Sequence, residues 1–238
     1  MYQNYIFDLY GTLVDIHTDE WKDSLWRDFC SVLAEQGTCY QPKELRTAYH
    51  DAVRQQEQAL RRTSGFDAPE IDIAPVFCQL LTAKGGTATN QEIAALAWIF
   101  RTLSMEKLRL FDGAEQLLRQ LKEKGKRVYL LSNAQALFTR PELTALGLEE
   151  YFDGILLSSQ AGVKKPDPQF YHLLLERYQL RPEQSLMVGN DDLADCHGAA
   201  AAGLDSCYIF TEQSPARRRP LPERCREIYH ILDGLTVE

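Results

Sequence analysis

The chain has 238 residues, of which 45% are hydrophobic, so it is long enough to bury a sizeable core. Its formal net charge of −8 argues against a nucleic-acid-binding protein, because such a protein needs clustered basic residues to displace counterions from phosphates. No apolar run approaches the roughly 18 residues of a membrane span, and the six cysteines form no CxxC pair, so we expect a cytoplasmic protein with reduced thiols that binds neither nucleic acid nor membrane.

The first predicted element is a short apolar strand over residues 5–9. A helical stretch follows over about residues 18–107, with apolar residues at near-helical spacing and no convincing strand. Within it, Thr89 and Glu92 form the Thr-x-x-Glu signature of a capping box. Helices with loops but no sheet to cover predict a separate helical domain, which we place at residues 16–107.

After this region, short apolar segments ending in LLSN, LLSS, MVGN and CYIF alternate with amphipathic helices. This alternation predicts an α/β fold, a doubly wound parallel sheet with helices on both faces, formed by residues 1–15 and 108–238. The basic run 217–219 lies among prolines and is predicted to be a solvated loop, with an anion or partner patch as the alternative. Ligands of such sheets bind beyond the carboxyl ends of the strands, so the residues that end each strand are the candidate site.

Polar residues follow the first two strands of the predicted sheet. A buried strand gains nothing from a terminal carboxylate, so Asp8 is a candidate nucleophile, although it is also compatible with an N-cap. Gly11 and Thr12 are suited to a tight turn whose N–H groups hold an anion. Ser132 and Asn133 offer a hydroxyl and an amide to an oxyanion, and ordinary N-cap chemistry is the alternative.

Charged residues follow the later strands. Lys165 precedes a proline that stiffens its loop, so it is the candidate site lysine and Lys164 the solvated one. Asp191, Asp192 and Asp195 cluster at a helix start, where negative charge is favourable in itself. Because three close carboxylates repel one another, a hard cation such as Mg²⁺ is the functional alternative.

With FDLYGT, LLSN, KKPDP and VGNDDLADCHGAAAAG in this order, the chain resembles the haloacid dehalogenase superfamily of hydrolases over about residues 4–234. The resemblance implies a Rossmann-like core with a mobile helical cap of the C1 type. It also implies a covalent aspartyl intermediate and a small phosphorylated metabolite as substrate. The residues that it assigns are the nucleophile Asp8, the group-binding Ser132 and Lys165, and a Mg²⁺ site made by Asp8, the carbonyl of Tyr10, Asp191 and Asp195.

One position departs from the phosphatases of this superfamily. They carry a second Asp two residues after the nucleophile as an acid and base, whereas this chain has Tyr10. Three functions follow. The first is a Mg²⁺-dependent phosphohydrolase that relies on a good leaving group, on a proton from the substrate or on Tyr10 as a partial replacement for that acid. The others are a metal-free 2-haloacid dehalogenase and a weakly active phosphometabolite-binding protein. We favour the phosphohydrolase because the acidic cluster is dense and no halide-binding segment is evident. Asn190 is the alternative to Asp191 as a metal ligand.

Overall fold

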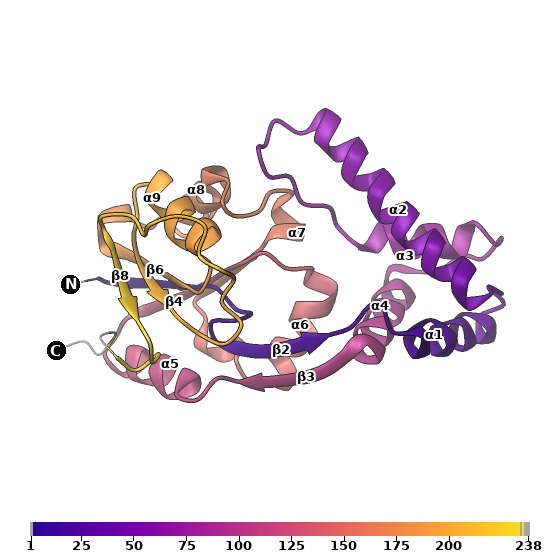
Figure 1. The fold of residues 1–238 in the computed structure, drawn as a ribbon, viewed down its shortest axis with the longest axis horizontal. Coiled ribbons are helices and arrows are strands. Elements are labelled where there is room, and N and C mark those ends of the chain that lie inside the picture. The colour runs from indigo at the N-terminus through magenta and orange to yellow at the C-terminus, as the bar shows by residue number, and fades with distance from the viewer. Residues whose placement is uncertain (1, 234, 236–238) are drawn as a thin grey trace.

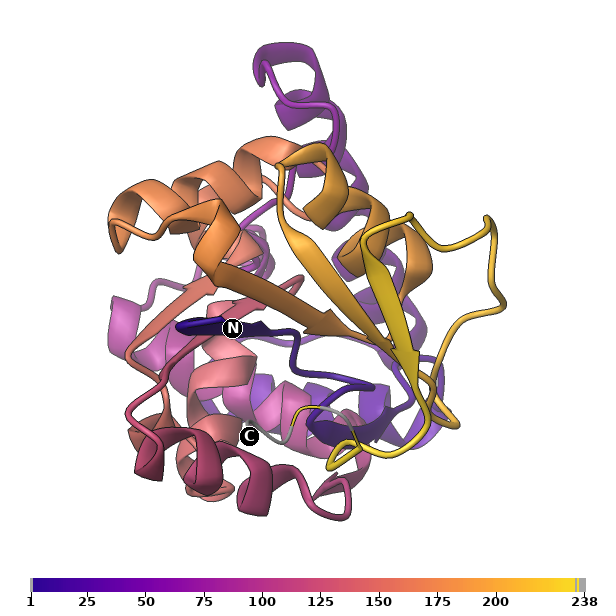
Figure 2. The ribbon, with the colours of Figure 1, turned by 90° about the vertical axis from the view of Figure 1, so that its left-hand side faces the viewer.

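The structure is a computed structural model that describes residues 2–233 and 235. Its larger sheet has six parallel strands in the order β5-β4-β1-β6-β7-β8 (Figures 1 and 2). Ile6 in the central strand lies beside Tyr129 on one side and Met187 on the other. The strands are β1 (Asn4–Phe7), β4 (Arg127–Ser132), β5 (Gly154–Leu157), β6 (Ser185–Gly189), β7 (Asp205–Ile209) and β8 (Cys225–Ile228).

Helices cover both faces of this sheet, as the alternating pattern predicts. On one face, Phe7 and Val188 pack in one apolar cluster with Leu117 of α5. On the other face, Ile6 packs in a second cluster with Phe170 of α8. The helices of this region are α5 (Ala114–Glu123), α6 (Ala136–Ala145), α7 (Ser158–Ala161), α8 (Pro168–Arg177) and α9 (Gly198–Ala201), with shorter turns at Glu149–Tyr151, Pro182–Gln184 and Asp192–His197. The predicted α/β fold class is confirmed.

Four helices form a separate layer at one end of the molecule (Figure 1). They are α1 (Asp23–Glu35), α2 (Pro42–Thr63), α3 (Ala74–Thr82) and α4 (Asn90–Ser104). Their apolar residues pack in a cluster around Trp26, Phe29, Phe77 and Phe100, which also includes Phe138 of α6. The predicted capping box is present at the start of α4, where Thr89 and Glu92 bond reciprocally. We refer to these helices as the cap.

An antiparallel ribbon joins the cap to the sheet. It is made by β2 (Val14–Thr18) and β3 (Met105–Leu110), which pair along most of their lengths. Neither strand was predicted from the sequence, nor was the edge strand β8, and the first strand ends before Leu9. The predicted domain boundaries at 15/16 and 107/108 fall inside this ribbon, and the division itself stays a prediction. Residues 1, 234 and 236–238 of the predicted core domain lie outside the described residues.

The loop between α2 and α3 also contacts the core directly. The main-chain N–H of Asp67 donates to Asp167 Oδ2 at 2.8 Å. Pro69 forms an isolated β-bridge with Val163, two residues before Lys165. The cap is therefore docked beside the segment that carries the candidate site lysine. Across the described part of the chain, none of the helices is long and apolar enough to cross a membrane.

Candidate active site

Three charged side chains meet at the carboxyl ends of β1 and β6. Lys165 Nζ lies 2.7 Å from Asp8 Oδ1 and 2.7 Å from Asp195 Oδ1. All three are buried, with Lys165 3% exposed, Asp8 8% and Asp195 1%. The ammonium therefore bridges two carboxylates that would otherwise repel each other in a region of low dielectric. These three residues were predicted to share one site, and the structure brings them together.

Burial and charge oppose each other in this triad. Burial lowers the pKa of Lys165, but the carboxylates of Asp195 and Asp8 outweigh it and raise the pKa above its ordinary value. Burial raises the pKa of Asp195 to about 6, although Lys165 acts to lower it. Lys165 consequently stays protonated at neutral pH and supplies a fixed positive charge beside the nucleophile candidate.

Ser132 ends β4 and Asn133 follows it, and the two side chains have different roles. Ser132 Oγ donates to Asp8 Oδ1 at 3.0 Å, so the hydroxyl lies at the carboxylate as predicted. The Asn133 amide holds the main chain of Lys165, accepting from its N–H at 2.8 Å and donating to its C=O at 2.9 Å. Asn133 thus fixes the position of the lysine, a role that the sequence did not indicate.

The turn after β1 is tight because of a glycine. Gly11 has φ of +80°, and a Cβ at this position would lie 2.3 Å from Asn190 Nδ2. Thr12 is fully buried, and its Oγ1 donates to Asn190 Oδ1 at 3.3 Å. The turn is therefore packed against the residue that follows β6, which leaves no room for a side chain at position 11.

We expect Gly11→Ala to destabilise the fold by about 1–3 kcal/mol and to lower activity, because alanine adds both φ strain and a clash with Asn190. Gly85→Ala is the matched control: Gly85 has φ of +78°, but a Cβ there would meet nothing within 4 Å. Urea unfolding of both variants separates the strain from the clash. Equal losses of unfolding free energy would show that the contact with Asn190 is unimportant.

The acidic cluster is held by the basic run rather than lying open. Asp191 accepts from Arg218 through both carboxylate oxygens at 2.6 Å, and its Oδ1 also caps the turn that follows. Asp192 Oδ2 accepts from the main-chain N–H groups of Arg218 and Arg219 at 2.9 Å. The prediction of a purely solvated basic loop at 217–219 is therefore incomplete, since Arg218 pairs with the acidic cluster.

These contacts bear directly on the predicted metal ligands. Asp195 Oδ1 is bound to Lys165, and its Oδ2 accepts from the N–H of Asp191 at 2.9 Å. Within residues 2–233 and 235, no group of three or more His, Cys, Asp or Glu side chains is arranged to hold a metal. Asp8 Oδ2 has no hydrogen-bond partner among those residues, and Asn190 lines the same cavity. Asp8 Oδ2 and Asn190 Oδ1, which accepts from Thr12 at 3.3 Å, therefore fit a hard cation better than the carboxylates of Asp191 and Asp195, which are paired with Arg218 and Lys165.

Tyr10 lines the site, but its hydroxyl is engaged elsewhere. It donates to Glu142 Oε2 in a short contact and lies 2.9 Å from Thr139 Oγ1. Burial, followed by the charge of Glu142, raises the pKa of Tyr10 above its ordinary value. The phenol is therefore a neutral donor at physiological pH and unsuited to act as a base.

The triad opens into a cavity of about 210 Å³. Three lining residues, Ala194, Gln213 and Pro215, were not identified from the sequence. Gln213 Nε2 donates to Asp15 Oδ1 at 2.5 Å and to the C=O of Ile16 at 2.8 Å, which holds the loop after β7 against the start of the ribbon. Their position in the sequence could have identified Gln213 and Pro215, since the loop that carries them also follows the carboxyl end of a parallel strand. The residues that line the cavity are Asp8, Tyr10, Ser132, Asn133, Lys165, Asn190, Asp191, Ala194, Asp195, Gln213 and Pro215.

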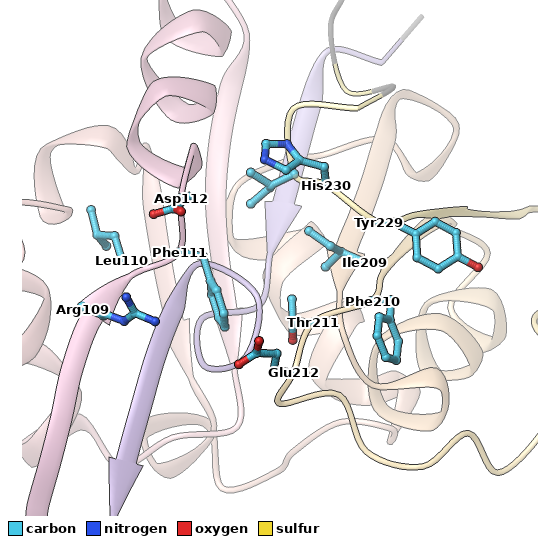
Figure 3. A pocket seen from close by; sticks show the side chains of 11 residues that line it. Arg109, Leu110, Phe111, Asp112, Ile209, Phe210, Thr211, Glu212, Tyr229 and His230 are labelled. Carbon is cyan, nitrogen blue, oxygen red and sulfur yellow. The ribbon is translucent and has the colours of Figure 1, made fainter.

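A second cavity of about 360 Å³ shares no lining residue with the first. Figure 3 shows the rings of Phe210 and Tyr229 on one side of this cavity and the side chains of Asp112 and Arg109 on the other. None of the residues assigned to the candidate site lines it. It therefore provides positions for control substitutions away from the chemistry.

Comparison with known proteins identifies the family of this chain. The family model of the haloacid dehalogenase-like hydrolases matches residues 2–203. The chain is 31% identical over 119 residues to glyceraldehyde 3-phosphate phosphatase of Methanothermobacter thermautotrophicus, covering 50% of this chain and 53% of that enzyme. It is 29% identical over 179 residues to ribulose-1,5-bisphosphate 5-phosphatase of Halopiger xanaduensis, covering 74% of both. The chain thus spans about half the length of the first of these relatives.

The fold is also found in a solved structure. A 2-haloacid dehalogenase from Pseudomonas syringae superposes with a TM-score of 0.65 at 20% identity, covering 97% of this chain and 95% of that one. At this identity the likeness concerns the fold alone. Because the family model covers most of the chain, this protein belongs to the haloacid dehalogenase-like hydrolases.

Proposed function

We propose that this chain is a phosphohydrolase that transfers the phosphoryl group of a small phosphorylated metabolite to Asp8 and then to water. The observation that carries the proposal is the buried triad, in which Asp8 lies 2.7 Å from the Lys165 ammonium and 3.0 Å from the Ser132 hydroxyl. Phosphoryl transfer depends mainly on positioning and on stabilising the charge of the transferring oxygens, which these groups supply. The phosphatase relatives support the same class of substrate.

The reaction has two steps in this proposal. The free Oδ2 of Asp8 attacks phosphorus, the bond to the leaving oxygen breaks, and an aspartyl phosphate forms. Water then attacks phosphorus, the bond to Asp8 Oδ2 breaks, and inorganic phosphate leaves with the protons of the water or passes one to solvent, which regenerates the Asp8 carboxylate. Lys165 and Ser132 balance the oxygen charge, and Gly11 and Thr12 remain the proposed turn at the phosphate. Because the hydroxyl of Tyr10 is bound to Glu142, the leaving oxygen takes its proton from solvent or substrate, which favours good leaving groups such as acyl phosphates.

Mg²⁺ belongs to this proposal with a smaller ligand set than the sequence suggested. Magnesium is commonly held by one or two carboxylates together with substrate phosphate and water. Asp8, the carbonyl of Tyr10 and Asn190 would hold it, while Asp191 stays paired with Arg218. When bound, the ion would reduce the repulsion between the Asp8 carboxylate and the anionic substrate. A cytoplasmic location is part of the same proposal.

The second candidate is a 2-haloacid dehalogenase, which needs neither an acid for its leaving group nor a metal. The observation that favours it is the engagement of Asp191 and Asp195 by Arg218 and Lys165, which removes two predicted metal ligands. A weakly active phosphometabolite-binding protein is the third candidate, because no second carboxylate lies two residues after Asp8.

We expect the purified protein to release phosphate from acetyl phosphate faster than from simple phosphate esters, and excess EDTA to suppress this release. The measurement is product release with and without EDTA, with 2-chloropropionate as the competing substrate, and added Mg²⁺ restoring activity as the control. Chloride release that is indifferent to EDTA would instead establish the dehalogenase. If neither product forms, the binding protein becomes the leading candidate.

A further inference from the structure

A buried ion pair connects the cap to the core beside the active site. Arg101 belongs to α4 of the cap, and Glu142 belongs to α6 of the core. Arg101 Nε lies 2.6 Å from Glu142 Oε1, and the two side chains are 11% and 1% exposed. Such a pair differs from a surface salt bridge, because losing one partner leaves an uncompensated buried charge.

Glu142 also holds the tyrosine that follows the nucleophile. Its Oε2 accepts from the hydroxyl of Tyr10, while its Oε1 accepts from Arg101. The guanidinium carbon of Arg101 lies 5.8 Å from the centroid of the Tyr10 ring and 5.2 Å from that of Phe138. One carboxylate therefore links a cap residue to a side chain that lines the reaction cavity.

We propose that Arg101 and Glu142 are positioning residues. Through Tyr10, they couple the docked position of the cap to the geometry of the active site. With the cap docked, Arg101 orients the Glu142 carboxylate, and that carboxylate orients the hydroxyl of Tyr10 at the cavity wall. With the cap displaced, Glu142 loses its cation, and Arg101 no longer holds in place the carboxylate that accepts from Tyr10. Tyr10 thus links the cap to the loop after β1, because it lies two residues after Asp8. This inference rests on the proposed function of the site only for its kinetic readout.

The kinetic test compares Arg101→Lys, Tyr10→Phe and their double variant. Lysine keeps the positive charge but lacks the planar fork, and phenylalanine keeps the ring but lacks the hydroxyl. We expect each single variant to lower kcat by about 10- to 100-fold with a smaller change in KM, because a small misplacement at the reacting centre is costly. The double variant should lose no more than the worse single variant. Additive losses, or full activity of Tyr10→Phe, would overturn the link.

Two further variants separate a positioning role from a structural one. Arg140→Gln is the matched control: it removes an exposed ion pair with Glu149 from the same helix α6 and should leave kcat unchanged. Glu142→Asp is the conservative variant, and we expect it to restore part of the kcat lost in Glu142→Gln. If Arg101→Lys lowers only the unfolding temperature and leaves kcat intact, the pair is merely structural.

Hydrogen exchange tests the same link without substrate. The N–H groups of Gly11, Leu13 and Val14 are bonded within the loop after β1, to the carbonyls of Val14 and Leu9, so their exchange reports its order. We expect Arg101→Lys to increase exchange in residues 9–14 as well as in the cap, and Arg140→Gln to change neither. Increased exchange confined to the cap would overturn the inference. Hydrogen exchange needs no turnover. Absence of phosphatase activity would therefore refute the proposed function, while the exchange data would still test the link from Arg101 through Glu142 to Tyr10.

Discussion

Asp8→Asn is expected to abolish phosphate release, lowering kcat by at least about 10⁴-fold, the scale seen when a nucleophile is removed from an enzyme. An amide cannot form the aspartyl phosphate, so the loss should concern the chemical step rather than substrate binding. The fold should survive, because the Asn side chain can still accept from Ser132 and because Lys165 keeps Asp195 as a partner. The measurement is kcat on acetyl phosphate together with urea unfolding.

Asp112→Asn provides the matched control for this prediction. Asp112 lines the second cavity, so the same loss of a carboxylate there should leave kcat unchanged (Figure 3). Mass spectrometry of rapidly quenched protein should detect a phosphorylated species in the parent chain and in Asp112→Asn but not in Asp8→Asn. Appreciable turnover by Asp8→Asn in protein of confirmed mass would contradict the nucleophile assignment for phosphatase and dehalogenase alike.

The central triad was predictable because the topology of a parallel sheet places certain residues together. Asp8 follows β1, Ser132 ends β4 and the acidic cluster follows β6, and these three strands are neighbours. Their carboxyl ends share one edge, so the residues that end the strands account for most of the site. Lys165 needed an additional step, because its position depends on the loop that Asn133 holds.

The partners of the other site residues were not predictable from local patterns. Tyr10 meets Glu142 across 132 positions of sequence, and Asp191 meets Arg218 across 27. Neither contact has a local signature, since Glu142 resembles an ordinary polar residue in a helix that also contains Pro141. A sequence pattern reports the face on which a residue lies, but it does not report which distant charge will neutralise that residue.

The missed strands have a similar explanation. β3, with the sequence MEKLRL, is mostly exposed and follows directly on α4, so its charged residues resemble the last turn of a helix. It is stabilised by pairing with β2, and Lys107 and Arg109 of β3 both contact the buried carboxylate of Asp15. β8 is a short edge strand with partly exposed residues and therefore lacks the apolar run of a buried strand.

Lys165→Met is expected to be the most damaging single change to stability and to lower activity as well. Methionine is similar in length but leaves the Asp8 and Asp195 carboxylates without the ammonium that lies 2.7 Å from each. Breaking a buried ion pair by removing one partner typically costs about 3–5 kcal/mol of unfolding free energy. Loss of the charge that stabilises the transferring oxygens should lower kcat by a further factor of about 10²–10³. Urea unfolding and kcat on acetyl phosphate measure the two effects separately.

The pH dependence of the same variant tests the electrostatic reason. Lys165 lowers the pKa of Asp195, which is already about 6 because of burial, so removing the ammonium should raise that pKa further. When the pKa of a carboxyl is higher in the folded than in the unfolded chain, the free energy of unfolding falls as pH rises between the two pKa values. The deficit of Lys165→Met should therefore be small near pH 4, where the carboxyl is protonated, and should grow through pH 6 and above. Lys164→Met is the control, since Lys164 is 38% exposed and its ion pair is with Glu70, outside the triad, and it should show no such slope. A deficit that is constant with pH would indicate lost packing rather than lost charge.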